Sequence, residues 1–218
     1  MKDIHKYAAE FIGTFAFVFV GISAMCNNAG LVGVALAHGL TIAVMVSALG
    51  HVSGGHFNPA ITVAIFITGK IETRDAIFYI VAQLLGAYVG ALAVKSSFSF
   101  MLYAPVTLGV PMLSATTLVS TGILMECILT FVLLIVVFGT VIDSRAPQVG
   151  GLFIGLAVAL GILAGGPLTG AAMNPARAFG PSLALGFWNH HFVYWVGPLL
   201  GGGLAALVYA RWIGEEGV

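Results

Sequence analysis

Charge is the property that this chain of 218 residues has least of. Lys and Arg number eight, Asp and Glu number eight, and charged residues make up 7% of the chain. So few charged side chains cannot cover a water-soluble globule, and we exclude that class. The net charge is zero and no run of basic residues occurs, which argues against nucleic acid or an anionic surface as a partner. The two cysteines, Cys26 and Cys127, offer neither a disulfide framework nor a metal-binding spacing, and no metal or cofactor is predicted.

The chain is rich in apolar residues instead. They make up 60% of the chain, and the mean hydropathy is +1.07. Their runs are continuous, whereas the strands of outer-membrane barrels alternate apolar and polar residues. A helix needs about 20 apolar residues to cross a bilayer. We therefore predict an all-α membrane protein with six transmembrane helices, at 8–27, 32–51, 76–96, 119–141, 149–166 and 191–212.

The tripeptide Asn-Pro-Ala occurs twice, beginning at Asn58 and at Asn174, 116 residues apart. The same offset maps Glu10–Phe15 onto Glu126–Phe131, so two separate stretches of each half keep one register. An internal duplication explains this most simply. Asn-Pro is also a compact helix start, because Asn caps free N–H groups and Pro suits the first turn.

Each Asn-Pro-Ala opens an apolar segment that is too short to span a membrane, at 58–68 and at 174–185. We predict two re-entrant half-helices. Each repeat then has three spans, so the second enters from the opposite side and the repeat is inverted. The chain is predicted as a single domain, 1–218, of two inverted repeats, about 1–100 and 117–218. An extracellular loop joins them.

The basic residues indicate the orientation. In this arrangement one side carries Lys2, Lys6, Lys70, Arg74, Arg145 and Arg211. Lys95 lies on the other side, and Arg177 lies inside the second half-helix. By the positive-inside rule, both termini are predicted to be cytoplasmic.

Polar backbone at membrane depth is tolerated only where protein buries it or water lines it. Half-helices that enter from opposite faces would meet near the midplane, with Asn58 and Asn174 at the junction. The expected result is a narrow, water-filled pore. We therefore predict that the lipid bilayer is a partner of the chain and that the substrate is small and neutral.

Glu10 and Glu126 are carboxyl groups inside apolar helices, where a charge needs a partner. A proton or ion relay is one interpretation. We favour the other, that both carboxyl groups brace the irregular backbone of the two re-entrant loops by hydrogen bonds. His51 and His56 flank the first loop and are assigned the same structural support rather than contact with the pore.

Four stretches together resemble the aquaporin (major intrinsic protein) family, over essentially the whole chain. They are 9–14 (AEFIGT), 51–62 (HVSGGHFNPAIT), 174–181 (NPARAFGP) and 194–198 (YWVGP). The resemblance implies a homotetramer with one pore in each subunit.

The resemblance also places the family's constriction at His38, Ile162, Ala171 and Arg177, counted from the two Asn residues. Strict water channels of the family typically have Phe and His in place of His38 and Ile162. Glycerol facilitators have Trp and Gly or Ala there, usually with Asp after the Arg, where this chain has Ala178. The quartet is most similar to that of plant vacuolar-membrane aquaporins, although the His that some of them carry in the long extracellular loop is absent.

We therefore expect a passive channel for water that also admits small neutral solutes such as ammonia or hydrogen peroxide and excludes protons and ions. A glycerol or urea facilitator is the alternative, and a secondary transporter or a scaffold protein with an incidental pore are further ones. An enzyme is not expected, because no nucleophile and base pair or metal-ligand cluster is evident. The membrane is expected to be the plasma membrane, or the vacuolar membrane if the source is eukaryotic.

Overall fold

The structure is a computed structural model that describes residues 2–145 and 149–213. These residues form helices and no strands. The long helices are α1 (Lys2–Cys26), α2 (Gly30–Ser53), α4 (Thr73–Ser97), α6 (Val119–Val137), α7 (Gly150–Thr169) and α9 (Val193–Val208). The short ones are α3 (Pro59–Ile67), α5 (Phe100–Tyr103), α8 (Pro175–Leu185) and a 3₁₀ turn, η1 (Thr107–Gly109). Single π-helical turns, η2 (Phe138–Ile142) and η3 (Tyr209–Ile213), extend α6 and α9.

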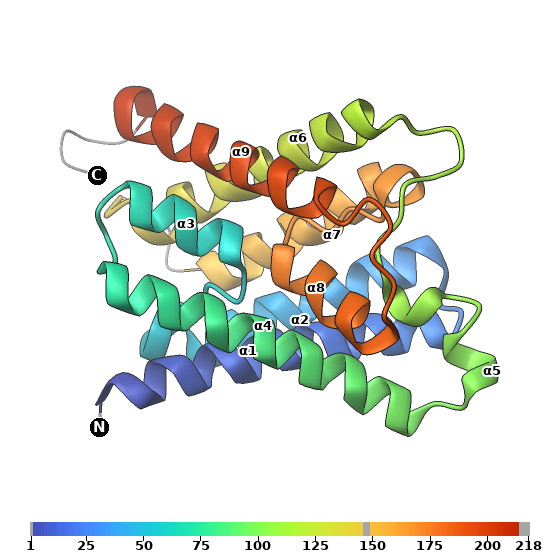
Figure 1. Cartoon of the computed structure of the whole chain (residues 1–218). Coiled ribbons are helices and arrows are strands. Elements are labelled where there is room, and N and C mark those ends of the chain that lie inside the picture. Colours follow the sequence, from blue (N-terminus) through green and yellow to red (C-terminus); the bar gives the residue numbers. More distant parts are fainter. Residues whose placement is uncertain (1, 146–148, 214–218) are drawn as a thin grey trace.

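Six helices are long and apolar enough to cross a membrane, which confirms the predicted number of spans. Their bounds differ from the prediction by a few residues. The first helix begins earlier, at Lys2, and the fifth continues to Thr169, three residues past its predicted end. The two ends of the described chain lie at the same end of the bundle (Figure 1), as an even number of spans requires.

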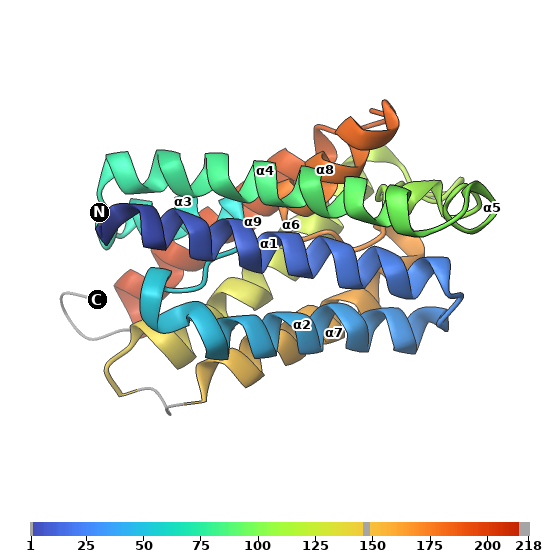
Figure 2. The ribbon, with the colours of Figure 1, turned by 90° about the horizontal axis from the view of Figure 1, so that it is seen from below.

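The long helices pack in two groups that meet along α2 and α7. In the first group α1 packs on α2 and α4, and in the second α6 packs on α7 and α9. Figure 2 shows α2 and α7 side by side. The half-helices cross between the groups, because α3 packs on α9 and α8 packs on α4. Each half-helix is therefore held by a long helix from the other half of the chain.

The contact between α2 and α7 depends on Gly39 and Gly155. A Cβ atom at Gly39 would lie 2.5 Å from the carbonyl oxygen of Gly155, and a Cβ atom at Gly155 would strike the carbonyl oxygen of Gly39. Small residues let helix backbones approach closely in membranes, where packing rather than hydrophobic burial drives association. The two glycines thus bring the two groups of helices together.

Helices α2 and α7 both end on a glycine in the left-handed conformation, Gly54 (φ 88°) and Gly170 (φ 81°). Glycine adopts this conformation without steric cost, so the chain turns sharply from each long helix into a loop. After a few residues each loop reaches the start of a half-helix. Both half-helices begin at the proline of Asn-Pro-Ala, as predicted.

The segment between the halves, predicted as an extracellular connector, has structure of its own. It contains α5 and η1, and Gly109 of η1 lies against Ile22 of α1. The Ser114 N–H donates to the carbonyl of Leu168 at 2.9 Å. The segment therefore folds back over the ends of helices from both halves, and it reaches the functional site described below.

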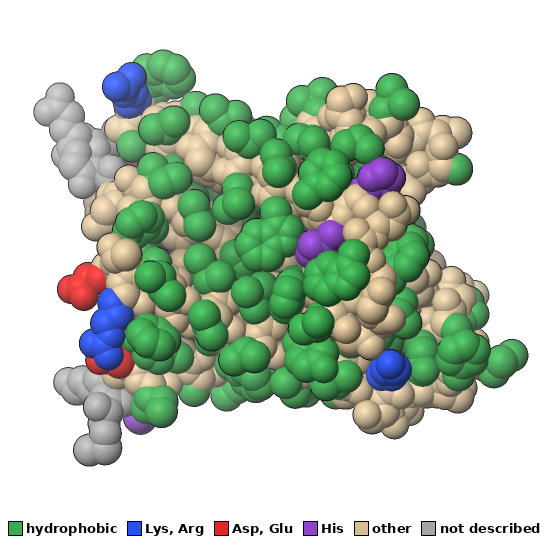
Figure 3. All heavy atoms as spheres, in the orientation of Figure 1, with side chains coloured by type: hydrophobic (Ala, Val, Ile, Leu, Met, Phe, Trp, Pro, Cys, Tyr) green, Lys and Arg blue, Asp and Glu red, His purple; other side chains and the backbone are tan. Residues whose placement is uncertain are grey.

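The outer surface is apolar across its middle. In the face drawn in Figure 3, hydrophobic side chains cover the central band, and most of the charged side chains gather at one end. Large apolar side chains that point outward include Leu36, Leu40 and Val44 on α2 and Leu160 on α7. A surface of this kind suits contact with lipid or with neighbouring subunits.

Candidate functional site

The carboxyl group of Glu10 holds the first re-entrant loop. It lies on α1 and is fully buried. One oxygen accepts from the Ser53 hydroxyl at 2.7 Å and the His56 N–H at 2.9 Å, and the other accepts from the Phe57 N–H at 2.6 Å and the Gln83 amide at 2.7 Å. Each backbone donor taken up in this way would otherwise be a buried, unpaired N–H group. Glu10 thus fixes the loop between α2 and α3.

Glu126 on α6 does the same for the second loop. Its oxygens accept from the Thr169 hydroxyl at 2.7 Å, the Ala172 N–H at 2.9 Å and the Met173 N–H at 2.7 Å. Ser53 has its counterpart in Thr169 at the same offset of 116 residues, and each hydroxyl also accepts a backbone N–H from its loop, at 3.1 Å and 3.0 Å. The two loops are therefore braced by matching hydrogen bonds.

The residues just before the two asparagines have strained backbones. Phe57 has φ 48° and Met173 has φ 50°, a region that residues other than glycine rarely adopt. Such strain costs of order 1–3 kcal/mol at each residue and persists only where the surroundings impose it. Here the bonds from Glu10 and Glu126 to these N–H groups impose it. The strain accompanies the turn that brings both carbonyl groups to the opposite asparagine.

Asn58 and Asn174 join the two half-helices tip to tip. The Asn58 Oδ1 caps α3 by accepting from the Ala60 N–H at 2.8 Å, and the Asn174 Oδ1 caps α8 by accepting from the Ala176 N–H at 2.9 Å. The Asn58 Nδ2 donates to the carbonyl of Met173 at 2.8 Å, and the Asn174 Nδ2 donates to the carbonyl of Phe57 at 2.9 Å. A side-chain amide has two N–H donors, so one on each asparagine remains for a solute.

A cavity of about 20 Å³ lies beside this pair, lined by both asparagines. Its other walls are mostly apolar and include Ile42, Leu133 and Val158. A polar cavity of this size holds about one water molecule. A passing molecule would therefore meet a few polar groups on an otherwise apolar wall.

The route continues to the end of the bundle where the termini lie. A second cavity, about 50 Å³, shares His56, Ile61 and Ile154 with the first. It shares Gly54 and Ile142 with a third cavity of about 330 Å³, which opens at that end. The three cavities thus follow one another from the asparagines outward.

Asp143 lines the third cavity and is buried. It accepts from the Arg145 Nε at 2.8 Å and from the Tyr209 hydroxyl at 2.8 Å. Hydrogen bonds from Arg145 hold the pKa of Asp143 well below its ordinary value. The carboxylate therefore ties the chain after η2 to the last helical turn.

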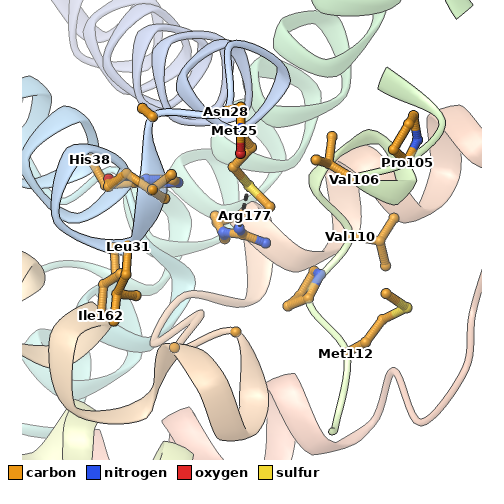
Figure 4. A pocket seen from close by; sticks show the side chains of 16 residues that line it. Met25, Asn28, Leu31, His38, Pro105, Val106, Val110, Met112, Ile162 and Arg177 are labelled. Carbon is orange, nitrogen blue, oxygen red and sulfur yellow. Dashed lines mark hydrogen bonds between the residues drawn. The ribbon is translucent and has the colours of Figure 1, made fainter. Parts of the chain in front are cut away.

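On the other side of the asparagines lies an outer cavity of about 390 Å³. His38, Ile162 and Arg177 line it, as Figure 4 shows. The Arg177 side chain is buried, and its Nη1 donates to the carbonyl of Gly109 at 2.7 Å. Its Nη2 lies 3.9 Å from the sulfur of Met25. The guanidinium is thus held at the inner end of the cavity by two acceptors.

His38 lies on α2, across the cavity from Arg177, and is buried. Its Nδ1 lies 2.9 Å from the carbonyl of Val34, so Nδ1 carries the proton in the neutral ring. The Nε2 then has a free lone pair, and it has no hydrogen-bond partner among the described residues. The ring of Phe17 packs edge-on against that of His38, with centroids 5.2 Å apart. This packing fixes the ring at the wall of the outer cavity.

The structure brings together most of the residues that the sequence singled out. Ala171 is buried beside the outer cavity, and its neighbour Gly170 lines that cavity. His51 is exposed at the end of α2 and lines the third cavity, and the support predicted for it is provided by Ser53 instead. His56 does support the loop, with its Nδ1 3.1 Å from the Thr62 hydroxyl, but it also lines the first two cavities, contrary to the prediction that it does not contact the pore.

Sequence reasoning missed several residues of the site. Ser53 and Thr169 are hydroxyl residues at the same offset as the two glutamates, and that match could have revealed them. Met25 and Gly109 carried no such signal. Their place beside Arg177 depends on how distant parts of the chain fold together.

Six helices are long and apolar enough to cross a membrane, and two half-helices meet at a pair of asparagines. Cavities follow one another on both sides of this meeting point, so the arrangement is that of a membrane channel. The Major intrinsic protein family profile matches residues 1–209. The chain is 49% identical to aquaporin TIP4-4 of Zea mays, over 94% of this chain and 85% of that protein. It is 45% identical to probable aquaporin TIP3-2 of Arabidopsis thaliana, over 95% and 83%. The solved aquaglyceroporin from Plasmodium falciparum has a similar fold, with a TM-score of 0.85 at 24% identity and 97% of each chain covered.

The chain belongs to the Major intrinsic protein family, the aquaporins, and it is a passive water channel. The recognised family and the fold class expected from the sequence are confirmed.

Proposed function

We propose that water crosses this chain in single file, past Arg177 and His38 and then past Asn58 and Asn174. The observation that carries the proposal is the arrangement of the asparagines. Each caps the half-helix that it begins and still has an N–H donor for a water oxygen. Both helix N-termini, which carry partial positive charge, point at this position, and that potential opposes cations and protons.

The selectivity filter in this proposal consists of His38, Ile162, Ala171 and Arg177. Ile162 makes one wall apolar, the His38 ring adds bulk beside it, and Arg177 offers fixed donors. A filter of this kind passes ammonia and hydrogen peroxide beside water and slows glycerol. The alternative is a glycerol or urea facilitator, which would need a wider constriction.

We also assign the chain one channel domain of two inverted repeats, about 1–100 and 117–218. The matched bonds of Glu10 and Glu126 support this division. A homotetramer suits the apolar outer faces of the helices, and both termini are assigned to the cytoplasm. No enzymatic activity is assigned. Of the two membranes expected, the vacuolar one is favoured by the filter's similarity to plant vacuolar-membrane aquaporins and by the plant relatives.

Osmotic swelling of proteoliposomes tests the proposal. We expect fast water flux with an activation energy close to that of water diffusion, because water in a pore breaks few hydrogen bonds that are not replaced. Flux that saturates and depends on an ion gradient would instead indicate a carrier and contradict the proposal.

A further inference from the structure

One face of α1 lines the filter, although the filter predicted from the sequence contains no residue of this helix. Phe17, Gly21 and Met25 are spaced four residues apart, so they lie on one side of the helix. Phe17 packs on the His38 ring. A Cβ atom at Gly21 would strike the Nε2 edge of the same ring. Met25 lies beside Arg177, so α1 contacts both polar side chains of the constriction.

The two contacts that hold Arg177 differ in strength and chemistry. The Gly109 carbonyl is a strong acceptor, at 2.7 Å from Nη1. The thioether of Met25 is a weak acceptor, at 3.9 Å from Nη2. Figure 4 shows Met25 directly above Arg177, with the dashed line joining sulfur to nitrogen. The weaker of these two contacts is also the one that can be modified chemically, because a thioether sulfur can be oxidised.

The sulfur of Met25 is within reach of small solutes. Met25 is half-buried and lines the outer cavity of about 390 Å³. Any solute that enters the filter from this side passes through that cavity. Thioethers are oxidised by peroxide to sulfoxides, which are polar and can be reduced again by methionine sulfoxide reductases.

We propose that Met25 is an oxidation site at which hydrogen peroxide entering the outer cavity modifies the filter and lowers water flux. The inference rests on the filter assigned under the proposed function. In the reaction the sulfur attacks one peroxide oxygen, an S–O bond forms and the O–O bond breaks. The sulfur loses two electrons, the peroxide is reduced, and the proton on the attacked oxygen moves to the departing oxygen, which leaves as water.

The product changes the filter in two ways. A sulfoxide oxygen is a strong acceptor that would hold the Arg177 guanidinium more tightly than the thioether does. The added oxygen atom also occupies space at the inner end of the cavity, where the route narrows. Both effects oppose the passage of water.

The test uses the Cys26→Ser, Cys127→Ser background, which removes both thiols, reconstituted in proteoliposomes. Hydrogen peroxide is added, oxidation of each methionine is measured by peptide mass spectrometry, and water flux is measured by stopped flow. We expect flux to fall at least about twofold as Met25 is oxidised, and to recover with methionine sulfoxide reductases A and B.

Two variants of Met25 distinguish oxidation at this residue from a structural effect of the substitution. The water flux of each variant is compared with that of its own untreated sample. Met25→Leu has no oxidisable sulfur, so its flux should not respond to peroxide. Met25→Gln carries a carbonyl acceptor like that of the sulfoxide, so its flux should start low and not respond. Met101→Leu is the matched control, since Met101 is largely exposed away from the cavity, and it should respond like the parent background.

Met112→Leu tests the other methionine of the outer cavity and should also respond like the background. Unchanged flux after full oxidation of Met25 would overturn the proposal, as would an equal loss of flux in Met25→Leu. A parent that conducts no water before treatment would instead contradict the proposed function. The two failures are therefore distinguishable.

Discussion

At the scale of single residues, His38 and Ile162 decide the chemistry of the wall that faces Arg177. Both line the outer cavity together with the guanidinium. We expect the double variant His38→Phe, Ile162→His to lower the permeability ratios of ammonia and hydrogen peroxide to water at least about threefold, because a bulky ring and a polar imidazole replace the present walls. Stopped-flow measurements with water, ammonia, hydrogen peroxide, urea and glycerol provide the comparison.

The conservative variant Ile162→Val is the control, since it keeps the wall apolar and should keep the parent's solute profile. An unchanged profile in the double variant would show that these two positions do not set selectivity. Fast glycerol flux through the parent would favour the facilitator instead.

The cysteines predict how the channel responds to mercurials. Cys26 is buried, Cys127 lies on α6 with its backbone against Gly197 and Gly201 of α9, and neither is among the residues that line the cavities described above. We expect the parent to resist mercury and Ala171→Cys to become sensitive, because position 171 adjoins Gly170 at the outer cavity. Water flux before and after a mercurial measures this.

Leu183→Cys serves as the control, because Leu183 points outward from α8 and a thiol there should not block the pore. Rapid block of the parent would mean that Cys26 or Cys127 is accessible from the pore.

At the scale of elements, each re-entrant loop depends on one carboxyl group. Replacing Glu126 by Gln turns one of its two carboxylate oxygens into an N–H₂ group, so at least one of the backbone N–H groups of Ala172 and Met173 loses its acceptor. A buried N–H left unpaired costs about 1–3 kcal/mol. We expect Glu126→Gln to lower the melting temperature in detergent by several degrees and to reduce water flux, measured on the same preparation.

Glu72→Gln is the matched control, since Glu72 is exposed, and it should leave both quantities unchanged. A proton relay would give a different result. In that case Glu126→Gln would retain its stability and abolish a proton flux that the parent shows.

The C-terminal end of α8 is tied to α9 through His191. The His191 Nε2 accepts from the Trp195 Nε1 at 3.1 Å, so Nδ1 carries the proton, and it lies 3.3 Å from the Ser182 hydroxyl. Burial lowers the pKa of His191 from its ordinary 6.5. The unfolded chain therefore takes up a proton on this ring at a higher pH than the folded chain does.

Stability should consequently fall as the pH drops below about 6.5, where the unfolded state binds more protons. We expect His191→Gln to flatten this part of the pH profile, measured as melting temperature between pH 8 and pH 5. His190→Gln should leave it unchanged, because His190 is exposed. An equal slope in both variants would exclude His191 as the cause.

At the scale of the whole molecule, exclusion of cations depends on two half-helices from different halves of the chain. Their N-termini converge at Asn58 and Asn174, near Arg177. We expect the double variant Asn58→Asp, Asn174→Asp to raise cation permeability at least about tenfold, because two carboxylates offset the positive potential there. Ion flux into proteoliposomes measures it.

Assembly of the double variant is checked by size-exclusion chromatography, since Asp cannot donate to the carbonyls of Phe57 and Met173. Arg177→Ser weakens the same potential while both asparagines remain, so it should also leak cations. Two correctly assembled variants that stay as cation-tight as the parent would rule out the electrostatic explanation.

The sequence by itself determined the six spans, the two half-helices and their order. Six apolar runs fixed six spans, because a bilayer requires a minimum length of apolar helix. Asn58-Pro59 and Asn174-Pro175 fixed the starts of both half-helices, because a cap and a first-turn proline act within a few residues. The offset of 116 residues also paired Glu10 with Glu126 before their contacts were known.

Only the tertiary structure decided which atoms meet at the filter. The Gly109 carbonyl and the Met25 sulfur lie 68 and 152 residues from Arg177 in the chain, and no local pattern marks either of them. Ser53 rather than His51 supports the first loop because of the direction in which α2 presents each side chain to Glu10. Periodicity and capping act over a few residues, whereas contacts between distant segments depend on how all the helices pack together.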